Sequence, residues 1–127
     1  MLKKRIKYED YEGTQREEDF FFNLSRAELM QMELEEVGGL KKRLEKLVQT
    51  QDTSEIAKCF KGIILDSYGE KSPDGKRFMK NQELSEAFSQ TEAYVELFIE
   101  ITTDDMAAAA FINGITQSAK DKPIIIK

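Results

Sequence analysis

The sequence predicts an α+β protein that is predominantly α-helical, with an N-terminal β-hairpin followed by about five or six helices. Residues 3–22 alternate polar and apolar positions around a turn, which is the pattern of two paired strands. Beyond residue 25, apolar residues recur three and four positions apart, the spacing of one helical face. We expect one domain at 1–115, with its helical body at 25–115, and a C-terminal tail at 116–127.

Composition limits the classes of function. The chain has 127 residues and a net charge of −5, which disfavours non-specific nucleic-acid binding. No apolar run of about 18 residues exists that could cross a membrane. The lone Cys59 and the lack of a secretory signal predict a reducing cytoplasm. Because the chain has no histidine, Ser-His and Cys-His nucleophile chemistry is excluded.

The hairpin turns at 10–13, where Gly13 supplies a positive φ. Its second strand ends in Phe20, Phe21 and Phe22, which point alternately to both faces. Either the helices of the domain cover this strand, or it presents an aromatic edge to a partner. Two strands alone are marginally stable, so a third strand is expected from the tail or from a second subunit.

Two helices are predicted directly after the hairpin. Ser25 and Glu28 form a capping box for a helix that ends at Gly38 and Gly39. A second helix at 40–49 has a basic face, which is either solvated or a docking patch for an acidic partner; it comprises Lys41, Lys42, Arg43 and Lys46.

A central helix is predicted from Thr53 to Tyr68, capped by Asp52 with Glu55. Gly69 is placed to end it in the left-handed conformation, and a turn follows at 72–75. Cys59 lies beside the apolar stripe and is interpreted as a small buried hydrophobe rather than a nucleophile.

Three further helices are expected. Asn81 caps a short helix that ends at Phe88. A second capping box, Ser89 with Glu92, opens the next helix. Thr103 caps the last helix, which Gly114 ends.

The three isoleucines of the tail, at 124–126, could add a strand to a sheet edge or hang loose. Glu96 and Glu100 could bind a metal only with partners from another helix. Asp74 lacks the other ligands of a calcium loop. We therefore predict no catalytic site, no metal site and no cofactor.

Several stretches, in this order and spacing, resemble a known family. They are Ile6–Gly13, Glu18–Leu29, Ser67–Ser72 with Asp74-Gly75 and Arg77-Phe78, Ala87–Tyr94, and Ala107–Ile115. Together they resemble the tail assembly chaperone family of long-tailed bacteriophages with non-contractile tails. The resemblance covers about Lys3 to Ile115, so it leaves out the tail.

This resemblance implies a non-enzymatic protein of the host bacterial cytoplasm that is absent from the mature virion. It implies binding to the tape measure protein, which is kept soluble, and help in recruiting major tail tube subunits. It also implies a longer, frameshifted form of the same protein, with this chain as the short form or shared part, and a homo-oligomer. The alternative is a structural virion protein, such as a tail completion or connector component.

A helical domain can hold an amphipathic partner helix through exposed aromatic and methionine side chains. The candidate contacts are Phe20, Phe22, Met30, Tyr68, Phe78 and Tyr94. Residues of these types are more often core than contact.

Overall fold

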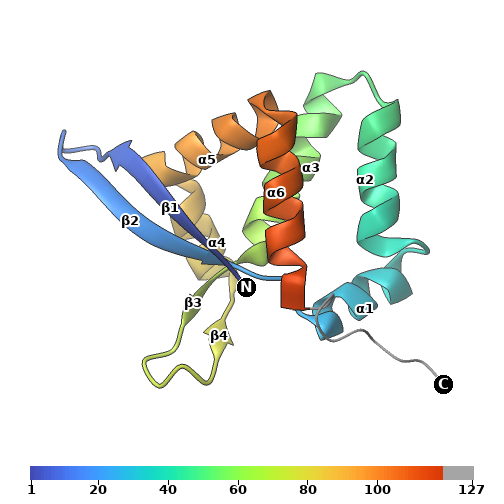
Figure 1. Ribbon diagram of the computed structural model, residues 1–127, viewed down its shortest axis with the longest axis horizontal. Coiled ribbons are helices and arrows are strands. Elements are labelled where there is room, and N and C mark those ends of the chain that lie inside the picture. Colours follow the sequence, from blue (N-terminus) through green and yellow to red (C-terminus); the bar gives the residue numbers. More distant parts are fainter. Residues whose placement is uncertain (119–127) are drawn as a thin grey trace.

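A computed structural model describes residues 1–118, apart from the side chain of Val48. The described strands form one antiparallel sheet in the order β1-β2-β3-β4, and the hairpin β1-β2 extends from one side of the molecule (Figure 1). Their bounds are β1 Leu2–Glu9, β2 Gln15–Phe22, β3 Tyr68–Lys71 and β4 Phe78–Met79. The predicted role of the tail isoleucines lies outside the described residues.

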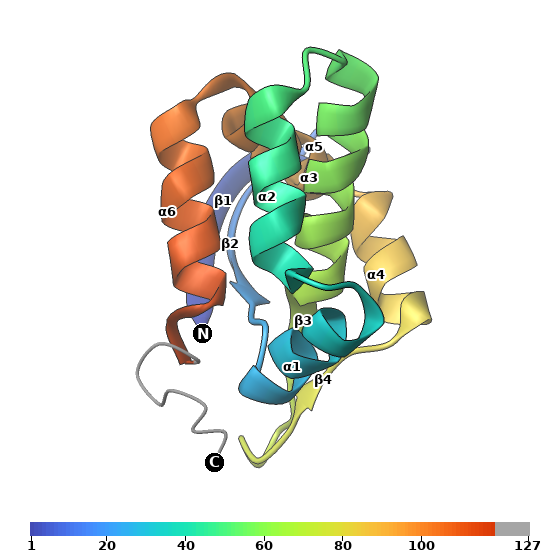
Figure 2. The same ribbon diagram turned by 90° about the vertical axis from the view of Figure 1, so that its right-hand side faces the viewer.

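Six helices are described, which confirms the predicted α+β, mainly helical class. They are α1 Arg26–Glu35, α2 Gly39–Gln49, α3 Thr53–Ser67, α4 Gln82–Ser89, α5 Glu92–Thr103 and α6 Asp105–Ile115. Helix α5 packs on β1 and α3, while α4 packs on β3. Helix α2 lies beside α3, and α1 contacts α2 at one end (Figure 2). None of these helices has the length and apolarity needed to cross a bilayer.

The hairpin has one face toward the helices and one toward solvent. Leu2, Ile6 and Phe22 point inward, while Lys3 and Arg5 are exposed on the outer face. Across the outer face, Arg5 contacts the carboxylates of Glu17 at 2.9 Å and Asp19 at 3.1 Å. Phe20 and Phe21 are half-buried and Phe22 is buried, so the structure favours the covered strand over an exposed aromatic edge.

The third and fourth strands of the sheet, β3 and β4, lie between α3 and α4. The prediction that the third strand comes from the tail or from a second subunit was therefore wrong. β2 continues past β1 and pairs with β3 at Phe21↔Gly69 and Phe22↔Tyr68. Gly69 therefore lies in a strand and does not end α3 in the left-handed conformation. The glycines with positive φ within residues 1–118 are Gly13, Gly38, Gly39 and Gly75.

A side chain at Gly69 has no room. A Cβ there would lie 2.7 Å from Cε2 of Phe78 and 2.8 Å from the carbonyl oxygen of Met79. We expect Gly69→Ala to lower the free energy of unfolding by about 1–3 kcal/mol, since ring and backbone must both shift. Chemical denaturation followed by circular dichroism measures this change.

Gly62→Ala is the matched control. Gly62 lies in α3, and an added Cβ would approach only the guanidinium end of Arg43, at 3.2 Å. Because alanine favours a helix over glycine, stability should stay equal or rise by up to about 1 kcal/mol. Equal losses from both substitutions would contradict this account of Gly69.

Three of the predicted helix caps are confirmed. Ser25 and Glu28 form the predicted reciprocal box, and Asn81 caps α4. Asp52 caps α3, but the carboxylate of Glu55 accepts from the Thr50 hydroxyl and completes no box.

Two predicted caps were wrong by one or two residues. Ser89 is still part of α4, where its hydroxyl donates to the Glu86 carbonyl, and Thr91, whose backbone is extended, caps α5 instead. Thr103 is still part of α5, where its hydroxyl donates to the Ile99 carbonyl, and Asp104, whose backbone is extended, caps α6.

Two glycine assignments were also wrong. Helix α6 continues through Gly114 to Ile115, and the missing side chain leaves room for Leu2, whose Cδ1 would lie 2.8 Å from a Cβ there. Helix α1 already ends at Glu35, and Gly38 is the N-cap of α2.

Backbone and side-chain hydrogen bonds join the ends of several elements at one place. The Lys80 ammonium donates to the carbonyl oxygens of Asn23 and Asp66 and contacts the Glu28 carboxylate at 2.6 Å. The Leu24 amide donates to the Ile115 carbonyl at 2.8 Å. These contacts fix the start of α1 against the ends of α3 and α6.

Candidate protein-binding surfaces

Four of the six predicted contact residues belong to one aromatic cluster around Phe88. Phe20, Phe22, Tyr68 and Tyr94 each have a ring within 4.2–5.9 Å of the Phe88 ring. Phe22 is 0% exposed and Tyr68 is 8% exposed, while Phe20 and Tyr94 are half-buried. In the folded chain, Phe22 and Tyr68 pack in the core, so Phe22 offers no free surface and Tyr68 offers little.

The other two predicted residues lie apart from this cluster. Phe78 is half-buried in β4, with its ring over Gly69. Met30 lies on α1 and is 37% exposed. Contact of any of the six with a partner stays a prediction, and Met30 is the one whose side chain is most open to solvent.

Burial determines how Tyr68 titrates. Desolvation, strengthened by the nearby Glu70 carboxylate, raises the pKa of Tyr68 to about 12. An unfolded tyrosine has a pKa of about 10, so the native state holds this proton more tightly. The stabilisation is complete below about pH 10 and is lost as pH rises toward 12.

Tyr68→Phe should therefore reduce the loss of stability between pH 10 and pH 12. The phenyl ring preserves the stack on Phe88, whose centroid lies 4.2 Å away, so stability near neutral pH should change little. Urea unfolding at pH 7, 10 and 11.5 measures both effects. Parallel pH dependences for the two proteins would show that Tyr68 ionisation is not coupled to unfolding.

Helix α1 and the turn after it expose large apolar side chains that point away from the core. On α1, Leu34 is 82% exposed and Met30 is 37% exposed, and Val37, in the turn two residues after the helix, is 82% exposed. Leu29 and Met32 point the other way and pack against the core. We call Met30, Leu34 and Val37 the α1 apolar surface. Of these three, only Met30 was a predicted contact residue, because a helix with apolar residues on both faces carries no sequence signal for which face is free.

The α1 apolar surface has an acidic rim. Glu33, Glu35 and Glu36 are all exposed on or just after the same helix. The basic face of α2 lies next along the chain, where Lys46 contacts Glu36 at 3.3 Å. An apolar strip flanked by carboxylates fits a helix whose own apolar stripe is flanked by lysine or arginine.

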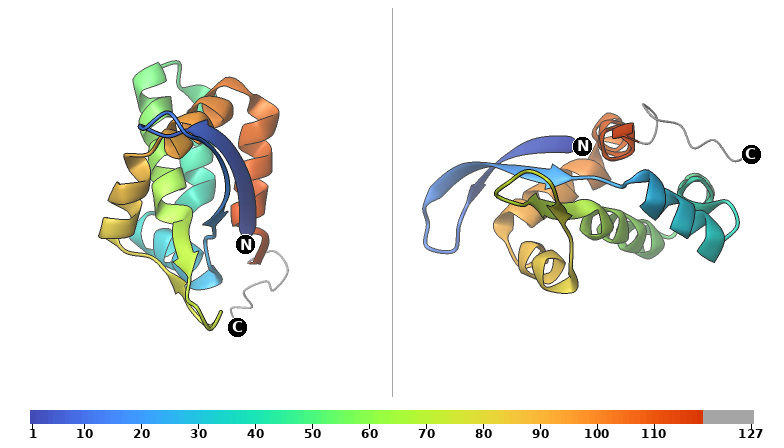
Figure 3. Two further views of the ribbon diagram at one scale, coloured as in Figure 1. Left: turned by 90° about the vertical axis from the view of Figure 1, so that its left-hand side faces the viewer. Right: turned by 90° about the horizontal axis from the view of Figure 1, so that it is seen from below.

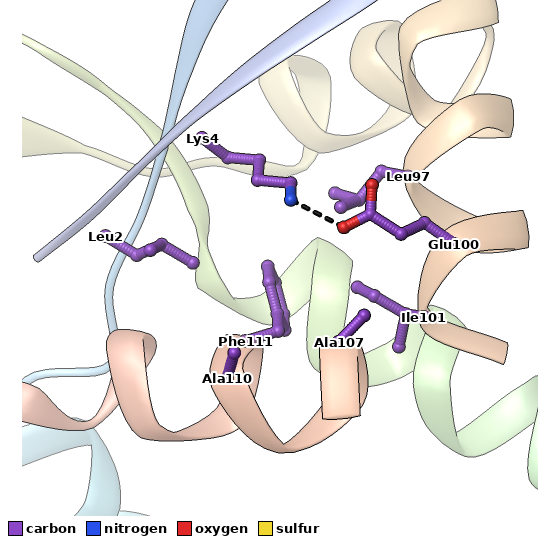
Figure 4. A pocket seen from close by; sticks show the side chains of 8 residues that line it. All are labelled: Leu2, Lys4, Leu97, Glu100, Ile101, Ala107, Ala110 and Phe111. Atoms are coloured by element: carbon purple, nitrogen blue, oxygen red, sulfur yellow. Dashed lines mark hydrogen bonds and ion pairs between the residues drawn. The ribbon is translucent and has the colours of Figure 1, made fainter. Parts of the chain in front are cut away.

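A small hollow lies between β1, α5 and α6 (Figure 4). Its volume is about 90 Å³, and its walls include Leu2, Leu97 and Phe111. Lys4 and Glu100 form an ion pair across it at 2.5 Å. Glu100 is thus held by an ammonium group, and no three acidic or cysteine side chains within residues 1–118 could hold a metal ion.

Comparison with known proteins assigns the chain to a family. A family model for phage tail assembly chaperones matches residues 1–118. The chain belongs to this family. No curated protein and no solved structure gives a significant match.

The family match covers both the hairpin and the helices of the chaperone. It ends at the last described residue, Ser118, whose hydroxyl donates to the side-chain oxygen of Asn23 at 3.3 Å. Thr116 is buried and its hydroxyl donates to the Ile112 carbonyl. The first residues of the predicted tail therefore contact the helical body.

Two other predicted features of the chaperone have structural roles. Within the basic face of α2, Arg43 is half-buried and lies 3.9 Å from Asp66, whereas Lys41 and Lys42 are exposed. Burial raises the pKa of the Cys59 thiol, and the nearby Arg43 offsets this only in part. A thiol with a raised pKa is a poor nucleophile at neutral pH.

Proposed function

We propose that this chaperone binds the tape measure protein and keeps it soluble until the tail tube forms around it. The observation that supports the proposal is the α1 apolar surface on a chain of this family. Met30, Leu34 and Val37 expose apolar area that a partner helix could cover. Covering it would remove apolar surface of both proteins from water, which is favourable by about 25 cal/mol per Å².

Charge would orient the partner helix on the α1 apolar surface. The carboxylates around the α1 apolar surface would pair with basic residues flanking the apolar stripe of the partner. The net charge of −5 would then keep the complex dispersed. Such pairs at the rim mainly set association rate and specificity.

The other partners follow from the same proposal. The chaperone helps recruit major tail tube subunits, and a longer frameshifted form shares its surfaces. Copies of the chain associate as a homo-oligomer. The chain acts by binding, without catalysis, in the host bacterial cytoplasm, and leaves before the virion is complete.

Co-expression tests the proposal. The tape measure protein is produced in bacteria alone, with this chaperone, and with an unrelated small acidic protein at the same level. We expect it in the soluble fraction only with the chaperone, and the two should co-purify. Equal solubility in all three cultures would show that the proposal is wrong.

A second measurement separates an assembly factor from a part of the particle. Mass spectrometry of purified virions should find the tube protein but not this chain. Stoichiometric presence of the chain would instead indicate a structural virion protein, such as a tail completion or connector component.

A further inference from the structure

The sheet has two long strand edges without a neighbouring strand in the described part of the chain. β1 is the terminal strand of the sheet, so no described strand pairs with its outer edge over Leu2–Glu9, and α6 contacts β1 at Leu2. β2 pairs with β3 only at Phe21 and Phe22, so its edge is open from residue 15 to residue 20. Open edges present backbone donors and acceptors that another strand can pair with.

The open edge of β2 borders a hollow where β3 diverges from it. This hollow has a volume of about 450 Å³ and is lined by Glu18 to Phe21 on one side and Tyr68 to Lys71 on the other. Seen from below, the hairpin extends beyond the helices, so neither long strand is enclosed by them along its whole length (Figure 3). A strand can approach β2 from this side.

The two edges have opposite charge. β1 contains four cations, Lys3, Lys4, Arg5 and Lys7, against Glu9 alone, and of these Lys4 is paired with Glu100 of α5. β2 contains Glu17, Glu18 and Asp19 against Arg16 alone. On the outer face, Arg5 is already shared between Glu17 and Asp19 of its own hairpin. Lys3 and Lys7 are exposed on that face and form no ion pair within residues 1–118.

Charge distinguishes the three ways in which two copies could join these edges. β1 against β1 would bring lysines together, and β2 against β2 would bring carboxylates together, both of which are unfavourable. β1 against β2 would place cations beside anions. Edge lysines commonly prevent pairing of like edges, and here they would permit only pairing with an acidic edge.

We propose that this edge-to-edge contact joins copies of the chain, with the basic β1 edge of one copy against the acidic β2 edge of the next. Each copy then uses two different surfaces, and the sheet continues from copy to copy. A contact of this kind is heterologous, so it generates a ring or an open chain of copies instead of a closed two-fold dimer. It extends the proposed homo-oligomer by naming its interface and symmetry.

Sedimentation of the purified chaperone alone tests this interface, so the result does not depend on tape measure binding. We expect the mean mass to rise beyond that of a dimer with protein concentration and to fall at high salt, which screens exposed charges. The β1 variant Lys3→Glu/Lys7→Glu and the β2 variant Glu17→Lys/Asp19→Lys should each sediment as monomers. Lys41→Glu/Lys42→Glu, the matched charge control on α2, should assemble like the parent chain.

Mixing the two edge variants gives the sharper result. The β1 variant has two acidic edges and the β2 variant has two basic edges, so an equimolar mixture should assemble again, with alternating copies. A substitution that merely unfolds the hairpin cannot be rescued in this way. A monomeric parent chain, a mass that stops at a dimer, or a mixture that stays monomeric would overturn the proposal.

Hydrogen exchange provides a readout that needs no substitution. Comparing the parent chain at low and high concentration should show slower exchange in residues 2–9 and 15–20 when copies associate. Slowing confined to the helices would place the contact elsewhere and contradict the edge-to-edge interface.

Discussion

Replacing Phe22 with alanine is expected to lower the free energy of unfolding by about 3–5 kcal/mol. The Phe22 side chain is 0% exposed. Its ring packs edge-on against Tyr68, Phe88 and Phe111, with centroid distances of 5.7, 5.7 and 5.2 Å. These three residues come from β3, α4 and α6, so the cavity would weaken contacts between all these elements. Urea unfolding followed by circular dichroism measures the loss.

Phe21→Ala is the matched control, because it removes the same side chain from the neighbouring position of the same strand. Phe21 points to the outer face, is half-buried, and has the Lys71 ammonium 4.3 Å from its ring centroid. We expect a loss of about 1–2 kcal/mol, from partial burial and this cation–π contact. Equal losses at Phe21 and Phe22 would contradict the assignment of the inner and outer faces.

The second large effect concerns binding. The double substitution Leu34→Gln/Val37→Thr should weaken binding to the tape measure protein at least about tenfold, because burying one such side chain contributes about 1.5–3 kcal/mol. Both side chains are 82% exposed in the free chain, so its stability should change by less than about 0.5 kcal/mol. Co-purification from cells and titration of the purified proteins measure the two quantities.

Met106→Gln controls for a general loss of exposed apolar area. Met106 is 83% exposed, but it lies on α6, away from the α1 apolar surface. We expect it to bind the tape measure protein like the parent chain. If Met106→Gln weakens binding as strongly as the α1 substitutions, binding does not depend on the α1 apolar surface.

The parts of the fold that sequence could predict are those fixed by neighbouring residues. The hairpin and the Ser25–Glu28 box depend on contacts within a few positions, and both were predicted. Ser89 and Thr91 are both residue types that cap helices, and what separates them is that α4 runs through Ser89, whereas the backbone is extended at Thr91. β3 has four residues, too few to show periodicity, and it is a strand because β2 lies beside it.

The candidate surface was predictable in part for a related reason. Apolar composition identifies side chains that avoid water, but only tertiary packing decides which of them the core accommodates. Phe22 and Tyr68 lie in that core, whereas Leu34 and Val37 have no element over them among the described residues and stay exposed. Met30 was the one predicted contact residue on the exposed side of α1.

Hydrogen exchange of the chaperone, free and in complex with the tape measure protein, tests most directly whether the folded chain acts through α1. We expect slower exchange in residues 26–37 of the bound chain, while α5, whose inner face is buried, and the end of β2 stay unchanged. Unchanged exchange across 26–37, with slowing elsewhere in the chain, would contradict it.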